Sequence, residues 1–467
     1  MHAVRIKMTE KTTRIAAIDI LRCIAIIGMV LSSNIGFSSG LPGWMFHAQT
    51  PPPTYAFNPE NVGLTWVDLV FPFFLFSMGA ALPFSMRKKM SRGASVPAVC
   101  SGIVKRWITL TLFAVVLGNA YRIGAGTQPE WAKQLFKIAV WVAMCLTLMR
   151  VPGMGKKLHG WLNAIGVVLL VLFAFALKNV FGVGINTGSD VIIMILAEAS
   201  LFGGLIWLLT RNSLKMRWAA IALIAGVKAA FAYIPQAAEA APAVWGGIGW
   251  FFQWSYLQYL IPVLIGSVIG DMLLRGRENA DKGNSAWAAA SVVCCATILI
   301  QLWGLYSRHI VADLVLTAAM AGVFAALTWK HREATWVKIG FVGMALTLAG
   351  IVFDPIDGGI AKDYCNLSYL LTTSGLGAVL VAALLAMEQN SSIRSGFLSA
   401  VGQNPMIAYT ITGFVIGPIL VLTGILPQLW QLAEGSVFWG LTEGIIITLL
   451  MMFFTALCTR VKLFWRS

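Results

Sequence analysis

Long apolar segments separated by short polar ones recur along nearly the whole chain. A helix needs about 20 apolar residues to cross the hydrocarbon core of a bilayer. Candidate segments of this kind are centred near residues 27, 74, 111, 141, 170, 200, 226, 264, 296, 319, 345, 377, 415 and 448. Those near 226, 319 and 345 are short or rich in Ala and Gly. The pattern therefore predicts an all-α, polytopic membrane bundle with an even number of spans, between ten and fourteen.

Basic residues alternate between the two sides when these spans are numbered from a cytoplasmic N-terminus. All but seven of the 34 Lys and Arg residues then fall on the same side of the membrane as the N-terminus. The seven on the other side are Arg122, Lys133, Lys137, Lys178, Lys228, Arg308 and Lys362. Because Lys and Arg are enriched in cytoplasmic loops, this bias predicts that both termini are cytoplasmic.

Composition excludes several classes of protein. The chain is 58% apolar and 11% charged, with a mean hydropathy of +0.79, whereas soluble domains carry roughly 25% charged residues. A soluble enzyme, a disordered chain and a disulfide scaffold are thereby excluded. The net charge of +15 is spread over loops on one side instead of gathering on one basic face, so we expect no nucleic-acid partner.

The sequence contains no metal-binding motif and no glycine-rich nucleotide-binding loop. The seven cysteines are odd in number and lack a Cys-x-x-Cys spacing, which is typical of buried apolar side chains. The string Gly36-Phe37-Ser38-Ser39-Gly40 follows a membrane helix and so lacks the strand–turn–helix context of a nucleophile elbow. We expect one transmembrane domain over residues 1–467, with a cytoplasmic tail at 1–14 and an outer loop at 36–63.

Ionisable residues at membrane depth are candidates for function because their burial is costly. They are Asp19, Arg22, Asp68, Glu198, Asp271, Asp313 and Glu443. Asp19 and Arg22 are three residues apart and can form a structural ion pair. Asp68 precedes Pro72, which frees a backbone carbonyl and kinks the helix. Asp68 either lines the wall of a polar-substrate site or makes a capping or interhelical hydrogen bond.

The outer loop carries one histidine, His47, and no Lys or Arg, but it contains five prolines. Beside Trp44 and Phe46, this short stiff loop is expected to fold back onto the bundle. Histidine titrates near neutral pH and suits a general base, although a lone loop histidine is usually only a surface residue. Asn34, at the outer end of the first span, is placed to orient the imidazole or to stabilise an oxyanion.

Several motifs along the chain resemble those of one family of membrane enzymes. The most specific is residues 63–79, which read Gly-Leu-Thr-Trp-Val-Asp-Leu-Val-Phe-Pro-Phe-Phe-Leu-Phe-Ser-Met-Gly. The others follow in the expected order: Arg14-x4-Asp19-x2-Arg22, Asn34, His47-Ala48, Leu367-Ser368-Tyr369, Thr373-Ser374-Gly375, residues 402–409 with Asn404, and Lys462-Leu463-Phe464-Trp465. The chain resembles the transmembrane acyltransferases typified by heparan-α-glucosaminide N-acetyltransferase and its bacterial relatives, the NagX-like or DUF5009 proteins.

The resemblance implies an enzyme of the bacterial inner membrane that uses cytoplasmic acetyl-CoA. It passes the acetyl group to the amine of a glucosamine-type sugar on the outer side, with an essential His47 assisted by Asn34. Three features depart from the family. Cys23 replaces the usual Gly, a proline-rich stretch separates Ala48 from Gly63, and the family has only ten or eleven spans.

Together, the residues and the resemblance predict two binding regions. The polyanionic nucleotide is expected at the cytoplasmic mouth, where guanidinium groups suit phosphate. The candidates there are Arg14, Asp19, Arg22, Lys105 and Arg106. On the outer side His47 would take a proton from the acceptor amine while Asn34 polarises the thioester carbonyl. Candidates for holding the sugar are Trp44, Asp68, Glu198, Asp313, Asn404 and Glu443.

Alternatives to this hypothesis remain open at this point. Transfer can be direct, or it can pass through an acetyl-histidine. A sugar or proton-coupled permease also has an even number of spans and buried carboxylates. An O-acyltransferase acting on a cell-envelope glycan would use the same donor. The expected partners are acetyl-CoA, the acceptor sugar, membrane lipid and a possible second copy of the chain.

Overall fold

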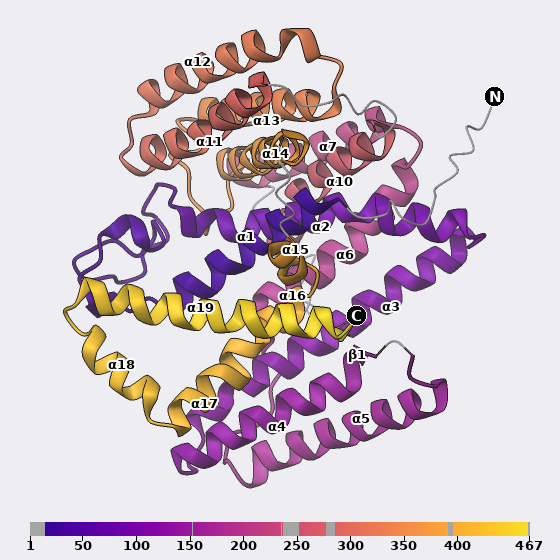
Figure 1. Cartoon of the computed structure of the whole chain (residues 1–467), viewed down its shortest axis with the longest axis vertical. Coiled ribbons are helices and arrows are strands. Elements are labelled where there is room, and N and C mark those ends of the chain that lie inside the picture. The colour runs from indigo at the N-terminus through magenta and orange to yellow at the C-terminus, as the bar shows by residue number, and fades with distance from the viewer. Residues whose placement is uncertain are drawn as a thin grey trace.

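The computed structural model is an all-α bundle (Figure 1). It describes residues 15–465 except 152, 235, 237–251, 277–284 and 391–395. Within this part, 14 helices are long and apolar enough to cross a membrane. This confirms the fourteen candidate segments, including the three short or Ala- and Gly-rich ones, and exceeds the ten or eleven spans that the family resemblance implied. The chain is a multi-pass membrane protein.

The helices are joined by connections of different length, of which the one between α1 and α2, residues 34–65, is long. The long ones are α1 (Ala16–Ser33), α2 (Trp66–Ser91), α3 (Val96–Tyr121), α4 (Glu130–Leu148), α5 (Lys156–Asn179), α6 (Val191–Thr210), α7 (Leu214–Tyr233), α10 (Leu260–Arg275), α11 (Ser285–Tyr306), α12 (Ile310–Thr328), α13 (Thr335–Phe353), α14 (Leu367–Asn390) and α19 (Val437–Arg460). One further span is built from α16 (Pro405–Ile411), a π-helical turn at Thr412–Ile416 and α17 (Gly417–Leu422).

Short elements complete the chain. They are α9 (Trp254–Leu257), α15 (Gly396–Gly402), α18 (Ile425–Ala433), and the 3-10 turns Phe37–Ser39, Gly43–Met45, Arg122–Ala125 and Trp329–His331. The strands β1 (Met149–Arg150) and β2 (Phe464–Trp465) pair antiparallel, with Met149 opposite Trp465. This two-stranded ribbon ties the end of the described chain to the segment between α4 and α5.

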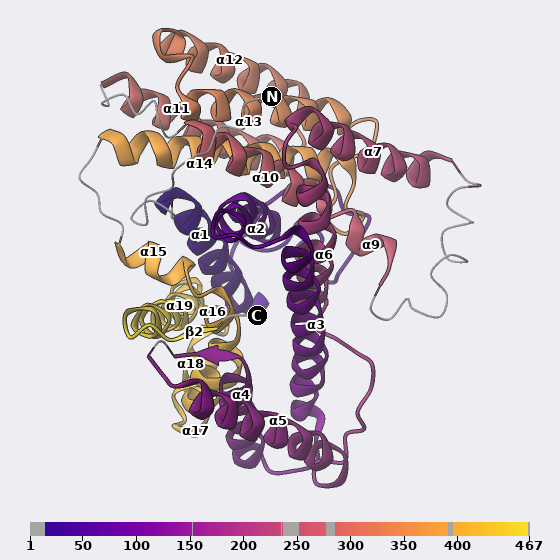
Figure 2. The ribbon, with the colours of Figure 1, turned by 90° about the vertical axis from the view of Figure 1, so that its right-hand side faces the viewer.

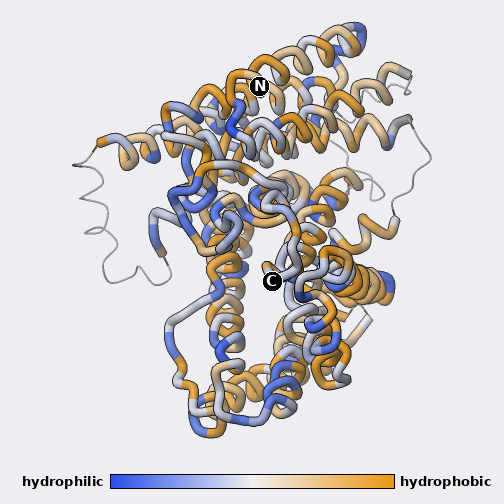
Figure 3. Tube along the Cα trace, turned by 90° about the vertical axis from the view of Figure 1, so that its left-hand side faces the viewer, coloured by the Kyte–Doolittle hydropathy of each residue, from blue (hydrophilic) through white to orange (hydrophobic). Residues whose placement is uncertain are grey.

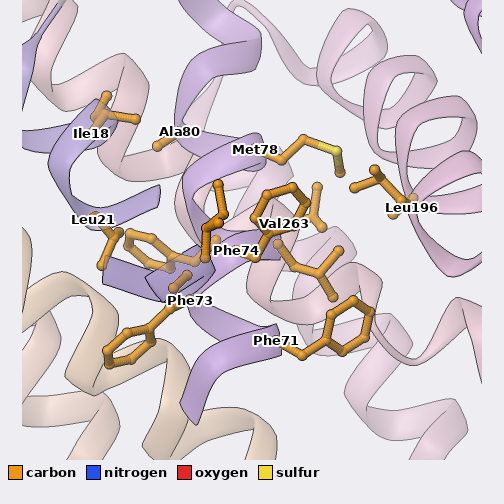
Figure 4. Close-up of a cluster of buried hydrophobic side chains, with 14 of the residues drawn as sticks. Ile18, Leu21, Phe71, Phe73, Phe74, Met78, Ala80, Leu196 and Val263 are labelled. Atoms are coloured by element: carbon orange, nitrogen blue, oxygen red, sulfur yellow. The ribbon is translucent and has the colours of Figure 1, made fainter. Parts of the chain in front are cut away.

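Helix α2 forms the centre of the bundle. In its most apolar window 89% of the residues are buried, against 17% in α5 and α12 and 11% in α7. Helices α1, α6, α10 and α14 pack around it (Figure 2), and its aromatic side chains share one buried cluster with aliphatic side chains such as Leu21, Leu196 and Val263 (Figure 4). Hydrophobic residues run along the weakly buried helices (Figure 3), as expected where a helix faces lipid.

Glycine allows α2 and α10 to approach each other closely. A Cβ atom on Gly79 would lie 1.9 Å from the carbonyl oxygen of Val263. On the opposing helix, Cβ atoms on Gly266 and Gly270 would lie 2.2 and 2.3 Å from the carbonyl oxygens of Phe76 and Ala80. Gly266 and Gly270 are spaced as in the small-residue motifs that let membrane helices pack backbone to backbone.

A buried ion cluster fastens α10 to α2, α6 and α7. Asp271 accepts from Arg217 NH1 at 2.5 Å and from Trp207 Nε1 at 3.1 Å, and its other oxygen accepts from Arg87 Nε at 3.1 Å. Arg217 lies in the first turn of α7 and is fully buried. A guanidinium is tolerated in the interior only when a carboxylate and other acceptors engage it.

Two loops meet at one end of the bundle, which we call the His47 end. Residues 34–65 connect α1 to α2, and residues 354–366 connect α13 to α14. Gly63 N donates to Ile360 O at 2.8 Å and so joins the loops. Asp354 holds Arg308 through two hydrogen bonds of 2.7 and 2.8 Å and accepts from Ile360 N. The two loops therefore share one side, as the alternation of spans predicted; we call the opposite end the Arg22 end.

The Gly79 contact generates a test of the central packing. Gly79→Ala should destabilise the fold by about 1–3 kcal/mol, because the added methyl group forces α2 and α10 apart. The measurement is the midpoint of thermal unfolding in detergent. Gly226→Ala in α7 is the matched control, since no heavy atom lies within 4 Å of its added Cβ; equal midpoints for the two variants would contradict the close packing.

Candidate active site

The loop at 34–65 folds back onto the bundle, as its prolines and aromatic residues predicted. Ile35, Leu41, Met45 and Phe46 form a small apolar cluster with neighbours from α1, α2 and α19. The rings of Phe37, Phe46 and Tyr55 pack at centroid distances of 5.0 to 5.2 Å. This miniature core fixes the backbone on both sides of His47.

His47 is held by a buried carboxylate. Its Nδ1 lies 2.6 Å from Asp68 Oδ1, and the Asp68 side chain is fully buried while that of His47 is 38% exposed. An ionised carboxylate only accepts, so Nδ1 carries the proton in this pair. The neutral imidazole then presents an unprotonated Nε2, the atom able to accept a proton from a ligand.

The second oxygen of Asp68 fixes the position of the carboxylate through backbone and side-chain hydrogen bonds. Oδ2 accepts from Thr65 N and Thr65 Oγ1, both at 3.0 Å, and from Ala48 N at 3.3 Å. Thr65 and Asp68 occupy the N-cap and N3 positions of α2, the spacing of a capping box. The capping alternative for Asp68 is therefore correct for Oδ2, while Oδ1 serves the histidine.

Pro72 adds a link to α14. A proline has no N–H, so the carbonyl four residues earlier, that of Asp68, loses its helical donor. Tyr369 OH donates to this carbonyl at 2.8 Å, and both residues are fully buried. The sequence indicated the freed carbonyl, and the structure shows that Tyr369 satisfies it. Helices α2 and α14 are thus joined at Asp68, the residue whose side chain holds His47.

Lys362, from the loop at 354–366, completes the cluster. Its Nζ lies 3.2 Å from His47 Nδ1 and 3.3 Å from His47 Nε2. Asn366 shapes this loop by accepting from Ala361 N and Tyr369 N and donating to Gly359 O. Sequence reasoning placed Lys362 only among the seven basic residues of the outer side. That position was itself a signal, because an outer lysine opposes the prevailing charge bias.

Asn34 and Trp44 lie near this cluster in sequence but take no part in its hydrogen bonds. The Asn34 amide donates to Val30 O at 2.7 Å and to Ser33 Oγ at 3.3 Å, so both of its hydrogens are used in its own helix. Trp44 is 51% exposed. Among the described contacts it is Asp68, not Asn34, that orients the imidazole.

The other carboxylates at membrane depth are dispersed. Glu198 accepts from Trp107 Nε1 at 3.0 Å, Asp313 from Gln301 Nε2 at 2.6 Å, and Glu443 from Trp430 Nε1 at 2.9 Å. They lie on α6, α12 and α19, and no described hydrogen bond joins any of them to His47. Each uses a neutral donor between helices, which agrees with the packing alternative for these residues.

Asn404 lies in a different setting from the one expected for an acceptor-binding residue. Its amide donates to Leu463 O at 2.6 Å and accepts from Trp465 N at 3.3 Å. Trp465 in turn packs on Phe113 of α3. Two motifs that the resemblance singled out, residues 402–409 and 462–465, are therefore joined to one another.

The Arg22 end holds the candidate nucleotide residues. Arg22 donates to Asp19 Oδ1 at 3.3 Å, Gly402 O at 3.2 Å and Ser77 O at 3.1 Å, which confirms that Asp19 and Arg22 pair. Both line a cavity of about 290 Å³. Arg106 lies near enough to Arg22 for their charges to repel. Lys105 is exposed, and Arg14 falls outside the described residues.

Two other chemistries find little support near His47. Burial raises the pKa of the Cys365 thiol, on the Lys362 loop, to about 12, so it is not a thiolate nucleophile at neutral pH. In the described part of the chain, no group of three or more His, Cys, Asp or Glu side chains could hold a metal ion. His47 and its partners are therefore the candidate groups for proton transfer that the hydrogen bonds at this end bring together.

Comparison with protein families identifies the family of the chain. A family model described as a domain of unknown function, DUF5009, matches residues 14–273, more than half of the chain. The matched part contains Asn34, His47 and Asp68 and ends before Lys362 and Tyr369. No curated protein matches the sequence.

The Tyr369 contact generates a prediction about stability. Tyr369→Phe should lower the free energy of unfolding by about 1–3 kcal/mol, because it leaves the buried Asp68 carbonyl without a donor. The thermal midpoint in detergent measures this loss. Tyr364→Phe is the control: its ring is exposed, and its hydroxyl has no hydrogen bond within the described chain. A neutral Tyr369→Phe would show that the carbonyl is satisfied in another way.

Proposed function

The chain belongs to the DUF5009 family, whose function is unknown, and we propose that it is a transmembrane acetyltransferase. It moves the acetyl group of cytoplasmic acetyl-CoA to the amine of a glucosamine-type sugar on the outer side of a bacterial inner membrane. One observation carries the proposal above all others. A buried carboxylate, Asp68, holds a partly exposed histidine, His47, at 2.6 Å in a loop that is fixed to the bundle.

A histidine held in this way is suited to general base catalysis. A carboxylate at Nδ1 fixes the tautomer and stabilises the imidazolium that forms when Nε2 takes a proton. The His47 side chain is 38% exposed, so an acceptor can reach Nε2 without local unfolding. A histidine whose ring only contacts solvent at the surface would not require a fully buried carboxylate as its partner.

The opposite end of the bundle supports a polyanionic donor. Arg22, Lys88, Lys105 and Arg106 bring positive charges to this end, and the carboxylates of Asp19 and Glu388 lie there as well. Arg106 Nε is shielded from solvent and has no hydrogen-bond partner in the described residues. Such guanidinium groups bind phosphate oxygens strongly. The nucleotide would stay at this mouth while the pantetheine arm carries the thioester through the bundle.

The chemistry requires one base and one carrier. The acceptor amine attacks the thioester carbonyl carbon, and His47 Nε2 takes the proton that the amine loses. Cleavage of the C–S bond releases the CoA sulfur, which recovers that proton from the imidazolium. The products are an amide and CoA. Direct transfer needs no second nucleophile, which favours it over an acetyl-histidine intermediate.

The base generates the first functional prediction. His47→Ala should reduce transfer of labelled acetyl from acetyl-CoA to glucosamine by about 10²–10⁴-fold, the usual contribution of a general base. The assay uses purified protein in liposomes, and the chemical stability of the product in alkali separates an amide from an ester. His309→Ala is the control, since His309 lies before α12 and its ring packs on Trp303, with no side-chain hydrogen bond in the described residues. An active His47→Ala would remove the proposed base, and sugar uptake without acetyl-CoA would favour a permease.

The charge bias generates a second prediction, about sidedness. Phe57→Cys, at an exposed position of the His47 end, should react with a membrane-impermeant maleimide added to intact spheroplasts. Lys330→Cys, at an exposed position after α12, should react only after the membrane is opened. The parent chain measures the background from its seven cysteines. The reverse pattern of labelling would invert the proposed orientation and place the base on the cytoplasmic side.

A further inference from the structure

Lys362 is a cation without a carboxylate partner among the described residues. Its ammonium contacts the His47 ring at 3.2 and 3.3 Å, and no described ion pair joins it to Asp68. The neighbouring cation differs, because Arg308 is held by both oxygens of Asp354. Asp68 offsets this positive charge only through space, so the ammonium beside the proposed base keeps its N–H donors available to a negative charge that a ligand brings or develops.

The contact geometry leaves the base free to work. Nearly equal distances to Nδ1 and Nε2 place the ammonium beside both ring nitrogens and not along the lone pair of Nε2. An acceptor can therefore approach Nε2 while Lys362 stays in place. Its three N–H donors then lie next to the atoms that react at Nε2.

The charges of Asp68, His47 and Lys362 indicate which negative charge the ammonium of Lys362 would meet during the reaction. With Asp68 ionised, Lys362 protonated and His47 neutral, the three side chains sum to zero. Transfer of a proton to His47 alone would leave the cluster at +1, which is unfavourable beside a low-dielectric bundle. A negative charge formed in the same step, next to the ammonium, restores neutrality. In acyl transfer the thioester oxygen becomes negative at that moment.

We propose that the Lys362 ammonium is the catalytic group that stabilises this oxyanion, an inference that rests on the acetyltransferase function proposed above. Asn34 was the sequence-based candidate, but both of its amide hydrogens are used within α1. As the acceptor nitrogen bonds to the carbonyl carbon, the C=O electron pair moves onto oxygen and the amine proton moves to His47. When the pair returns, the C–S bond breaks and the sulfur takes the proton from His47.

Kinetics of Lys362 variants test this assignment with glucosamine, an acceptor without an anionic group. Lys362→Met should lower kcat by about 10²–10³-fold, the usual effect of losing an oxyanion donor, with KM for glucosamine and for acetyl-CoA changed by less than about threefold. Lys362→Arg should recover part of kcat, because it keeps a cation. Lys228→Met is the matched control: Lys228 Nζ donates to Tyr364 O in the same loop, and its removal should leave kcat unchanged.

Each other outcome overturns the assignment in a distinct way. Unchanged kcat in a Lys362→Met protein that transfers acetyl would dismiss Lys362 while leaving the acetyltransferase function intact. A loss confined to KM for glucosamine 6-phosphate would make Lys362 a site for an acidic group of the acceptor. A kcat loss shared by Lys228→Met, or a lower thermal midpoint for Lys362→Arg, would indicate a structural effect on the loop. If the parent protein itself transfers no acetyl, the proposed function fails first.

Discussion

The arrangement at the His47 end depends on the two oxygens of one buried carboxylate. Asp68 is fully buried, so its charge is tolerated only because every side of the group is engaged. One oxygen binds His47, and the other begins helix α2 and reaches the backbone of the histidine's own loop. The start of α2 and the position of the histidine therefore depend on the same side chain. A shift of the helix start would move the histidine with it.

Other parts of the molecule support this point. Close glycine contacts hold α2 against α10, and the carbonyl freed by Pro72 is bound by Tyr369 from α14. The loop that follows α13 is braced by Arg308 and Asp354 and delivers Lys362 to the histidine. The loop at 34–65, the start of α2 and the loop at 354–366 thus meet at the His47 end. Their contacts with the helices hold both loops in place.

The two ends of the bundle differ in how their cations are paired with carboxylates. At the Arg22 end one arginine pairs with one carboxylate and Arg106 lies nearby, and in the Asp271 cluster two arginines contact one carboxylate. At the His47 end the ammonium of Lys362 lies beside the imidazole of His47. Its positive charge is offset by the carboxylate of Asp68, with which it forms no described ion pair. The first arrangement suits a ligand that brings several permanent negative charges. The second suits one that develops a single negative charge during reaction.

The sequence by itself determined the membrane class, the fourteen segments able to span and the pairing of Asp19 with Arg22, because hydrophobic length and helical spacing are local properties. It also singled out His47 and Asp68 as unusual residues. It did not determine that Asp68 holds His47, that Tyr369 binds the carbonyl freed by Pro72, that Arg217 is buried or that Asn34 is turned into its own helix. Lys362 lies 315 residues from His47, and no local pattern encodes that distance. The packing of α13 on α14 and of α14 on α2 decided which of the scattered polar groups meet, because the partners of a buried charge are the groups nearest to it in space, whatever their distance along the chain.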